Sequence, residues 1–237
     1  RFYELLKEQK DRSRASRKNA GVDAWISDAT DLSDLSATEF TGYTDNTAEA
    51  KVIALVKDGE RCDVAYKEDS VIAILDKTPF YAEMGGQVAD HGVILIGESR
   101  FEVNNVQKDK GGKYLHSGKM VRGSIKTEDV VCASIDVERR KAIMRAHSAT
   151  HLLQKALQTV LGDHVHQAGS YVNEDYLRFD FTHFSAMTPE EIAQVNALVQ
   201  EAVLEGYGVD IREMSIDEAK AMGATALFSE KYGDTVR

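Results

Sequence analysis

Short apolar runs recur between residues 40 and 135. KVIALV, RCDVAY, SVIAIL, GVILI and RFEVNNV are rich in β-branched residues, and KDGE, KEDS, GES and KGGK lie between them. Strands of this length, separated by turn residues at this spacing, are typical of an antiparallel barrel or sandwich. The pattern therefore predicts an antiparallel β-barrel domain over residues 40–135.

From residue 136 the apolar positions follow a helical period instead. Asp136 is the predicted N-cap of a helix that ends at Gly162, and a β-like segment follows from Ser170 to Phe181. Thr188-Pro189-Glu190-Glu191 and Ser215-Ile216-Asp217-Glu218 are capping boxes that predict two further helices. The fold class predicted is α+β, with the barrel followed by an α+β domain over residues 136–237 whose first helix packs on a sheet.

Residues 1–39 differ from both regions. Phe2, Leu5, Leu6 and Gln9 have helical spacing and predict the end of a longer helix, while DATDLSDLSATEF is acidic, rich in Ser and Thr, and typical of a linker. The chain has no initiator methionine. We therefore expect a fragment of a longer protein.

Composition narrows the class of protein. The 237 residues are 43% hydrophobic and 29% charged, which excludes a wholly disordered chain, and the net charge of −10 argues against a broad non-specific nucleic-acid coat. The chain contains no apolar run of about 18 residues, so no membrane span is predicted. The charged N-terminus is not a signal peptide. Cys62 and Cys132 form no CxxC pattern, so a reducing, cytoplasmic location is expected.

The sharpest chemical feature is the pair His147 and His151. Side chains four positions apart project from one face of a helix, so two imidazoles there can share a Zn²⁺ ion. The HExxH peptidases use the same spacing, but their general base is a Glu at the position that Ser148 occupies here, so a peptidase is disfavoured. Two ligands do not complete a tetrahedral site, and the alternative is a pair of histidines that cap or pack within an amphipathic helix.

Two further groups of residues suggest contact with phosphates or RNA. A basic cluster in the turns before the histidines can hold phosphates, although an ordinary solvated helix face that pairs with Glu138 explains it equally well. Gly85 and Gly86 permit positive φ or a close backbone approach, either by an RNA backbone or within a hairpin of the barrel. The basic cluster consists of Arg139, Arg140, Lys141 and Arg145.

Several motifs taken together resemble one family. TPFYAEMGGQVADHG, RAHSATHLLQKAL, YLRFDF and GATALFSEKYGDTVR follow one another along the chain. In this order they resemble the alanyl-tRNA synthetase family, in the part that follows its aminoacylation and tRNA-recognition regions. The resemblance implies that residues 1–39 are the end of the helical tRNA-recognition region plus a linker, 40–135 the β-barrel, and 136–237 an editing domain truncated before its second pair of metal ligands.

The resemblance also implies a reaction and its residues. The editing domain of this family hydrolyses tRNA(Ala) wrongly charged with serine or glycine, in a zinc-dependent site. His147 and His151 match two zinc ligands, Thr150 matches a threonine that lines the pocket, and Gln167 matches a glutamine at the pocket. A downstream Cys and His supply the other ligands in the family, so we expect an incomplete zinc site and weak or no activity in this chain. ATP and Mg²⁺ serve only the aminoacylation core, which ligates alanine to tRNA(Ala) and which this sequence lacks.

The partners expected are the acceptor end of tRNA(Ala) carrying serine or glycine and the rest of the synthetase in cis, with no membrane. An alanine pocket must admit glycine and discriminates serine poorly, so a second hydrolytic site is useful. Two alternatives stay open. One is a free-standing hydrolase that edits in trans, and the other is a catalytically silent tRNA-binding module.

Overall fold

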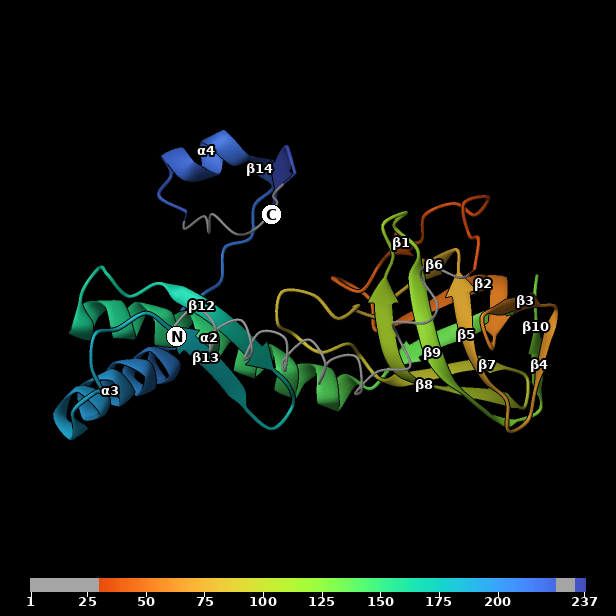
Figure 1. Cartoon of the computed structure of the whole chain (residues 1–237), viewed down its shortest axis with the longest axis horizontal. Coiled ribbons are helices and arrows are strands. Elements are labelled where there is room, and N and C mark those ends of the chain that lie inside the picture. The colour runs from red at the N-terminus through yellow and green to blue at the C-terminus, as the bar shows by residue number, and fades with distance from the viewer. Residues whose placement is uncertain (1–29, 225–232) are drawn as a thin grey trace, which may run out of the picture. The chain divides into compact units, whose positions relative to one another are not determined.

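The computed structural model of the chain describes residues 30–224 and 233–237, and Figure 1 shows its elements. The helix expected around Phe2 to Gln9 lies outside the described residues. Two compact units are present, one ending at Ala186 and the other beginning at Met187. The first unit contains the barrel and the histidine helix, and the domain boundary at residue 135 stays a prediction.

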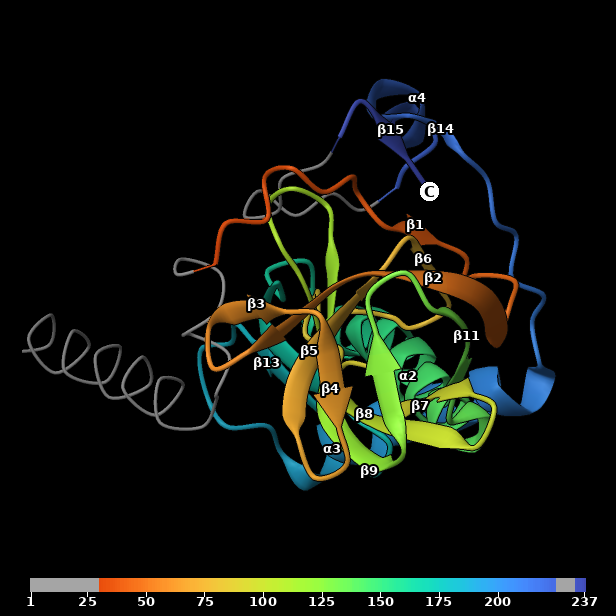
Figure 2. The same cartoon turned by 90° about the vertical axis from the view of Figure 1, so that its right-hand side faces the viewer.

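Six of the described strands close into an antiparallel barrel, which Figure 2 shows from one end. The order around the barrel is β11-β7-β8-β9-β5-β2, and β11 closes the ring because it pairs with β2 as well as with β7. The predicted antiparallel barrel is thereby confirmed. These strands are β2 (Thr47–Lys57), β5 (Ser70–Leu75), β7 (Gly92–Ile96), β8 (Ser99–Lys108), β9 (Tyr114–Arg122) and β11 (Val130–Ile135).

The barrel interior is filled by side chains from alternate positions of these strands. On β8, for example, Phe101, Val103 and Val106 are buried, whereas Arg100 and Glu102, on either side of Phe101, are exposed and form an ion pair. Phe80, from the loop after β6, is completely buried in the same core. Alternate positions along a strand point to opposite faces, which separates the core of the barrel from its surface.

Short strands complete the rim of the barrel. β3 (Glu60–Cys62) extends the sheet beside β2, β4 (Val64–Tyr66) pairs with β10 (Ser124–Lys126), and β1 (Glu39–Phe40) pairs in parallel with β6 (Lys77–Thr78).

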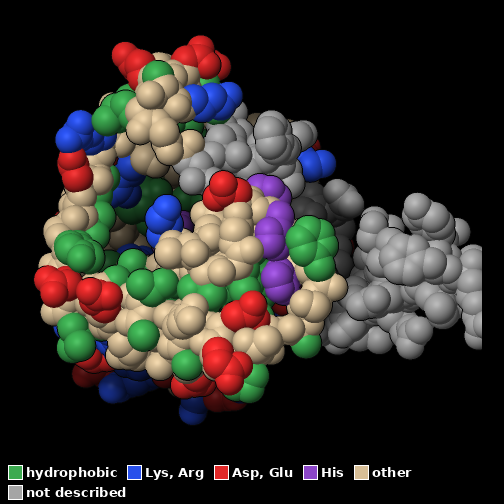
Figure 3. All heavy atoms as spheres, turned by 90° about the vertical axis from the view of Figure 1, so that its left-hand side faces the viewer, with side chains coloured by type: hydrophobic (Ala, Val, Ile, Leu, Met, Phe, Trp, Pro, Cys, Tyr) green, Lys and Arg blue, Asp and Glu red, His purple; other side chains and the backbone are tan. Residues whose placement is uncertain are grey.

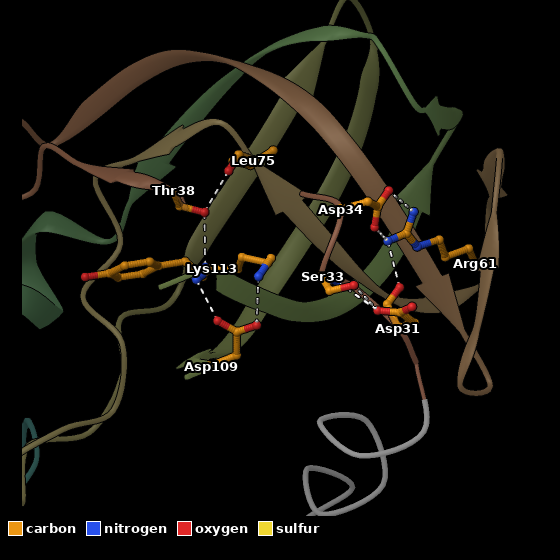
Figure 4. Close-up of polar contacts among 9 residues, drawn as sticks. Asp31, Ser33, Asp34, Thr38, Arg61, Leu75, Asp109 and Lys113 are labelled. Carbon is orange, nitrogen blue, oxygen red and sulfur yellow. Dashed lines mark hydrogen bonds and ion pairs between the residues drawn. The ribbon is translucent and has the colours of Figure 1, made fainter. Parts of the chain in front are cut away.

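The acidic segment before β1 lies against the barrel. The Thr38 hydroxyl donates to the Leu75 carbonyl at 2.8 Å and accepts from the Tyr114 amide at 3.1 Å (Figure 4). Arg61 pairs with the Asp34 carboxylate. Leu32 is buried in a satellite cluster on the barrel surface. Within residues 30–38, Leu32, Asp34 and Thr38 therefore have barrel partners that an acidic composition alone does not reveal.

The histidine helix begins where the last barrel strand ends. In α2 (Val137–Leu161) the Asp136 side chain accepts from the Arg139 amide at 3.0 Å, which confirms the predicted N-cap. Gly162 ends the helix with a φ of 111°. The hairpin of β12 (Gln167–Val172) and β13 (Leu177–Phe181) packs along α2, so the predicted helix-on-sheet arrangement is confirmed as well.

The second unit begins with α3 (Pro189–Glu205), which starts at the predicted capping box of Thr188 and Glu191. The second capping box, Ser215 with Glu218, starts α4 (Ile216–Ala221), and β14 (Met214–Ser215) pairs with β15 (Thr235–Val236). None of the described helices combines the length and the apolar character that a membrane crossing needs.

Candidate functional site

The two histidines lie together on α2. Their ring centroids are 5.2 Å apart with planes 29° from parallel, as side chains one helical turn apart allow. His151 is exposed, whereas His147 is half-buried, and burial together with the neighbouring charge of His151 lowers the pKa of His147. His147 is therefore a neutral imidazole at neutral pH, which is the form that binds metal ions.

Thr150, predicted to line the pocket, lies between the two histidines in the sequence. Its side chain is buried. Its hydroxyl donates to the carbonyl of Ala146 at 3.0 Å. A hydroxyl that donates in this way still has lone pairs that can accept. Because the hydroxyl proton of Thr150 is donated to the helix backbone, this side chain can only accept a hydrogen bond from a ligand.

A residue that the sequence analysis did not select completes this arrangement. The Gln87 side chain, which is buried, places Oε1 at 2.7 Å from Nδ1 of His147. Gln87 lies 60 positions earlier, in the loop between β6 and β7, directly after Gly85-Gly86 in the TPFYAEMGGQ motif. Its place in that motif was the available signal, but only the packing of α2 against the barrel shows which side chain it meets.

The glycine turn holds the hairpin against the barrel. Gly86 has a φ of 83°, its carbonyl accepts from the Val172 amide at 2.8 Å, and the Val88 amide donates to the Val172 carbonyl at 3.1 Å. A Cβ at Gly86 would lie 2.5 Å from the Ser170 hydroxyl oxygen and 2.7 Å from the Ser170 carbonyl oxygen. The close approach that this glycine permits is therefore made by β12, and a contact of Gly85 and Gly86 with an RNA backbone stays a prediction.

Replacing Gly86 by alanine is expected to destabilise the chain more than replacing Gly85. Both glycines have positive φ, which costs an L-residue about 1–2 kcal/mol, but a Cβ at Gly85 meets open space. Only Gly86→Ala adds a clash with β12. Urea unfolding of both variants measures the difference, and equal midpoints would show that the contact with Ser170 does not exist in solution.

Two residues of the predicted phosphate-binding cluster are engaged inside the protein. Arg140 is buried, and its guanidinium group donates to Asp90, with Nε 2.9 Å from Oδ1, and to the carbonyls of Gly42 and Pro79. A phosphate cannot reach it, so the tRNA-binding prediction for Arg140 is corrected. The spacing along α2 did not reveal this, because only the packing of the helix shows that the side of its first turns carrying Arg140 faces the barrel.

Arg139 is similarly occupied. Its Nε donates to Glu174 at 2.9 Å and its Nη1 to the carbonyl of Ala89 at 2.7 Å, so it ties α2 to both the hairpin and the barrel. Lys141 and Arg145 are exposed, and Lys141 pairs with Glu138 in the way the alternative explanation proposed. Lys141 and Arg145 are the two cluster residues that remain accessible to a phosphate.

Gln167 is the first residue of β12 and is half-buried, on the strand that packs along α2. Its convergence with the histidines on one cleft stays a prediction.

A second group of rings lies beyond the end of α2, where Nε2 of His164 is 2.9 Å from Nδ1 of His183 and the His164 ring stacks on Phe184 at 4.5 Å. Figure 3 shows histidine side chains gathered on one face beside hydrophobic ones.

On α2, the donors that a metal ion could use are the imidazoles of His147 and His151. Within residues 30–224 and 233–237, no group of three or more His, Cys, Asp or Glu side chains is placed to hold a metal ion. Two imidazoles on one helix face fit half of a tetrahedral zinc site.

Comparison with known proteins agrees with this reading of fold and motifs. The family described as tRNA synthetases class II (A) matches residues 1–139, so the chain belongs to the class II (A) tRNA synthetases. Over its whole length it is 53% identical to the alanine–tRNA ligase of Acetivibrio thermocellus, 45% identical to that of Bacillus pumilus and 46% identical to that of a Thermoanaerobacter species. The chain spans 27% of the length of each of these relatives. The resemblance to alanyl-tRNA synthetases is thereby confirmed.

Proposed function

We propose that this chain forms part of the editing site of a cytoplasmic alanine–tRNA ligase, where tRNA(Ala) wrongly charged with serine or glycine is hydrolysed. The observation that carries the proposal is the pair of stacked imidazoles on α2, one of them half-buried, neutral and hydrogen-bonded by a buried glutamine. Ligation of alanine with ATP and Mg²⁺ belongs, in this proposal, to the remaining part of the synthetase.

The reaction is the hydrolysis of an ester. Water adds to the carbonyl carbon that joins the amino acid to the terminal adenosine, the bond to the ribose oxygen breaks, and free amino acid and uncharged tRNA result. Thr150 can accept a hydrogen bond from the substrate or from water, because its own proton is donated to Ala146. Gln167, if it reaches the same cleft, can both donate and accept.

His147 and His151 are the residues that would hold Zn²⁺, with the remaining ligands supplied by the rest of the synthetase. When bound, such an ion polarises a carbonyl or activates water. His147 contributes a neutral imidazole whose Nδ1 is already engaged by Gln87. The accessible Lys141 and Arg145 are the cluster residues that we assign to the tRNA backbone.

The test is deacylation of Ser-tRNA(Ala) by the full-length parent protein with zinc, compared with its His147→Ala and His151→Ala variants. Loss of a residue that only supports a metal ligand typically costs about 10–100-fold, so loss of a ligand itself is expected to cost more. His166→Ala is the matched control, because His166 is exposed and its backbone amide, not its ring, bonds to Thr182.

The outcomes separate the competing functions. Hydrolysis that survives in both variants would contradict a histidine-dependent site. Binding of tRNA(Ala) with no hydrolysis in any form of the protein would favour the silent binding module. Hydrolysis by this 237-residue chain alone, equal to that of the full-length protein, would favour a hydrolase that needs no further ligands and could act in trans.

A further inference from the structure

The side chain of Gln87 joins the barrel region to the histidine pair. Backbone hydrogen bonds hold Gln87 on both sides. The amide of each of Gln87 and Met84 donates to the carbonyl of the other, and the neighbours Gly86 and Val88 bond to Val172 of β12. Its own side chain is buried, and the amide oxygen lies 2.7 Å from Nδ1 of His147. The position of this amide is therefore determined by the barrel and the hairpin, and not by the helix that carries the histidine.

The chemistry of this contact fixes the proton on the imidazole. An amide oxygen can only accept a hydrogen bond, so Nδ1 of His147 must carry the proton and donate. A neutral imidazole has one protonated nitrogen, and Nε2 then keeps its lone pair. The hydrogen bond made by one ring nitrogen decides in this way which nitrogen is left to bind a metal ion.

We propose that Gln87 is a positioning residue of the histidine site, which holds His147 as its Nδ1–H tautomer and leaves Nε2 free as a metal ligand. The inference rests on the proposed function, because it assigns the free nitrogen to the zinc ion of the editing reaction. It gives the barrel a direct part in the site: residues 84–88 brace the hairpin through their backbone and orient a ligand through one side chain.

The opposite orientation of the amide makes the opposite prediction. If the NH₂ group of Gln87 faced the ring, the amide would donate to Nδ1 and the imidazole proton would lie on Nε2. Nε2 would then have to lose this proton before it could bind a metal ion. The tautomer of His147 in the metal-free protein therefore decides the proposal.

The first experiment measures that tautomer in this chain. Long-range ¹H–¹⁵N correlation spectra of the ¹⁵N-histidine-labelled, metal-free protein at about pH 8, where imidazoles are neutral, distinguish a protonated from an unprotonated ring nitrogen. A His147→Asn variant assigns the signals. We expect Nδ1 of His147 to be protonated and Nε2 unprotonated, and a protonated Nε2 would overturn the proposal.

Variants of Gln87 test the cause. Gln87→Leu removes the acceptor and is expected to shift His147 toward the Nε2–H tautomer, whereas Gln87→Glu keeps an acceptor oxygen and is expected to retain Nδ1–H. Gln158→Leu is the matched control, because Gln158 lies on the same helix and bonds to the Val165 carbonyl. An unchanged tautomer in Gln87→Leu would show that another group positions the ring.

A zinc titration of the full-length parent protein tests the consequence. Gln87→Leu is expected to weaken Zn²⁺ binding about 10–100-fold, the usual effect of losing a residue that orients a ligand, and Gln87→Glu is expected to preserve it. Equal zinc affinity in all three proteins would contradict the positioning role. The tautomer and the affinity do not depend on hydrolysis, so a protein that shows both effects but never deacylates tRNA would refute the proposed function and leave the role of Gln87 intact.

Discussion

Arg140→Met is expected to lower the free energy of unfolding by about 3–5 kcal/mol, the usual cost of breaking a buried ion pair by removing one partner. The Asp90 side chain is 2% exposed and that of Arg140 is 11% exposed, so the substitution leaves a carboxylate buried without its counter-charge. It also removes the donors to the carbonyls of Gly42 and Pro79. Urea unfolding at neutral pH measures the loss.

Two comparisons identify the mechanism. Lys141→Met removes the neighbouring exposed ion pair with Glu138, which is worth about 0–1 kcal/mol, and serves as the matched control on the same turn of helix. Adding Asp90→Asn to Arg140→Met is expected to restore part of the stability, because the amide is uncharged and its oxygen can still accept from the Tyr81 amide. If Arg140→Met costs no more than Lys141→Met, the buried pair is not formed in solution.

Acidification is expected to destabilise the barrel through His116. This histidine is completely buried, with Nδ1 at 3.0 Å from the Ala73 carbonyl, Nε2 at 2.7 Å from the Thr78 hydroxyl, and its ring edge-on to Phe80. Burial lowers the pKa of His116 to about 4, although its backbone hydrogen bonds act in the opposite direction. The protonated form is therefore excluded from the folded barrel over most of the mildly acidic range.

The direction of this pH dependence follows from the pKa values of His116 in the folded and the unfolded chain. In the unfolded chain His116 binds a proton below about pH 6.5, but in the folded chain it does so only near pH 4. The stabilising contribution is complete above about pH 6.5 and is lost as the pH falls through this window, for a total of about 3 kcal/mol. About 2 kcal/mol of this falls between about pH 7 and about pH 5.

The measurement compares free energies of unfolding at these two pH values in the wild type and in His116→Gln. The variant is expected to lose the His116 part of the pH dependence whatever its absolute stability. Other groups with lowered pKa values, such as His91 and His147, contribute to both proteins equally. His166→Gln, at an exposed position, is expected to keep the wild-type pH dependence, and a His116→Gln variant that keeps it too would refute the assignment.

The parts of the fold that depend on neighbouring residues were predictable from the sequence. The caps at Asp136, Thr188 and Ser215 are confirmed because a cap is made by a side chain and an amide three positions away. The barrel strands are confirmed because runs of β-branched residues bounded by turn residues are a local signal of short strands. The spacing of His147 and His151 likewise placed both rings on one face of a helix.

The roles of Arg140, Gly86 and Gln87 were decided only by the tertiary structure. A run of basic residues on a helix looks solvated until the barrel surface opposite it is known, and that surface contributes Asp90 from 50 positions earlier. A glycine turn looks like an RNA contact or a simple hairpin until β12 is seen against it. By itself, the sequence determined the family, the elements and the two histidines, since each depends on local patterns. The neighbours of those residues depend on how distant segments pack, and no local pattern contains that information.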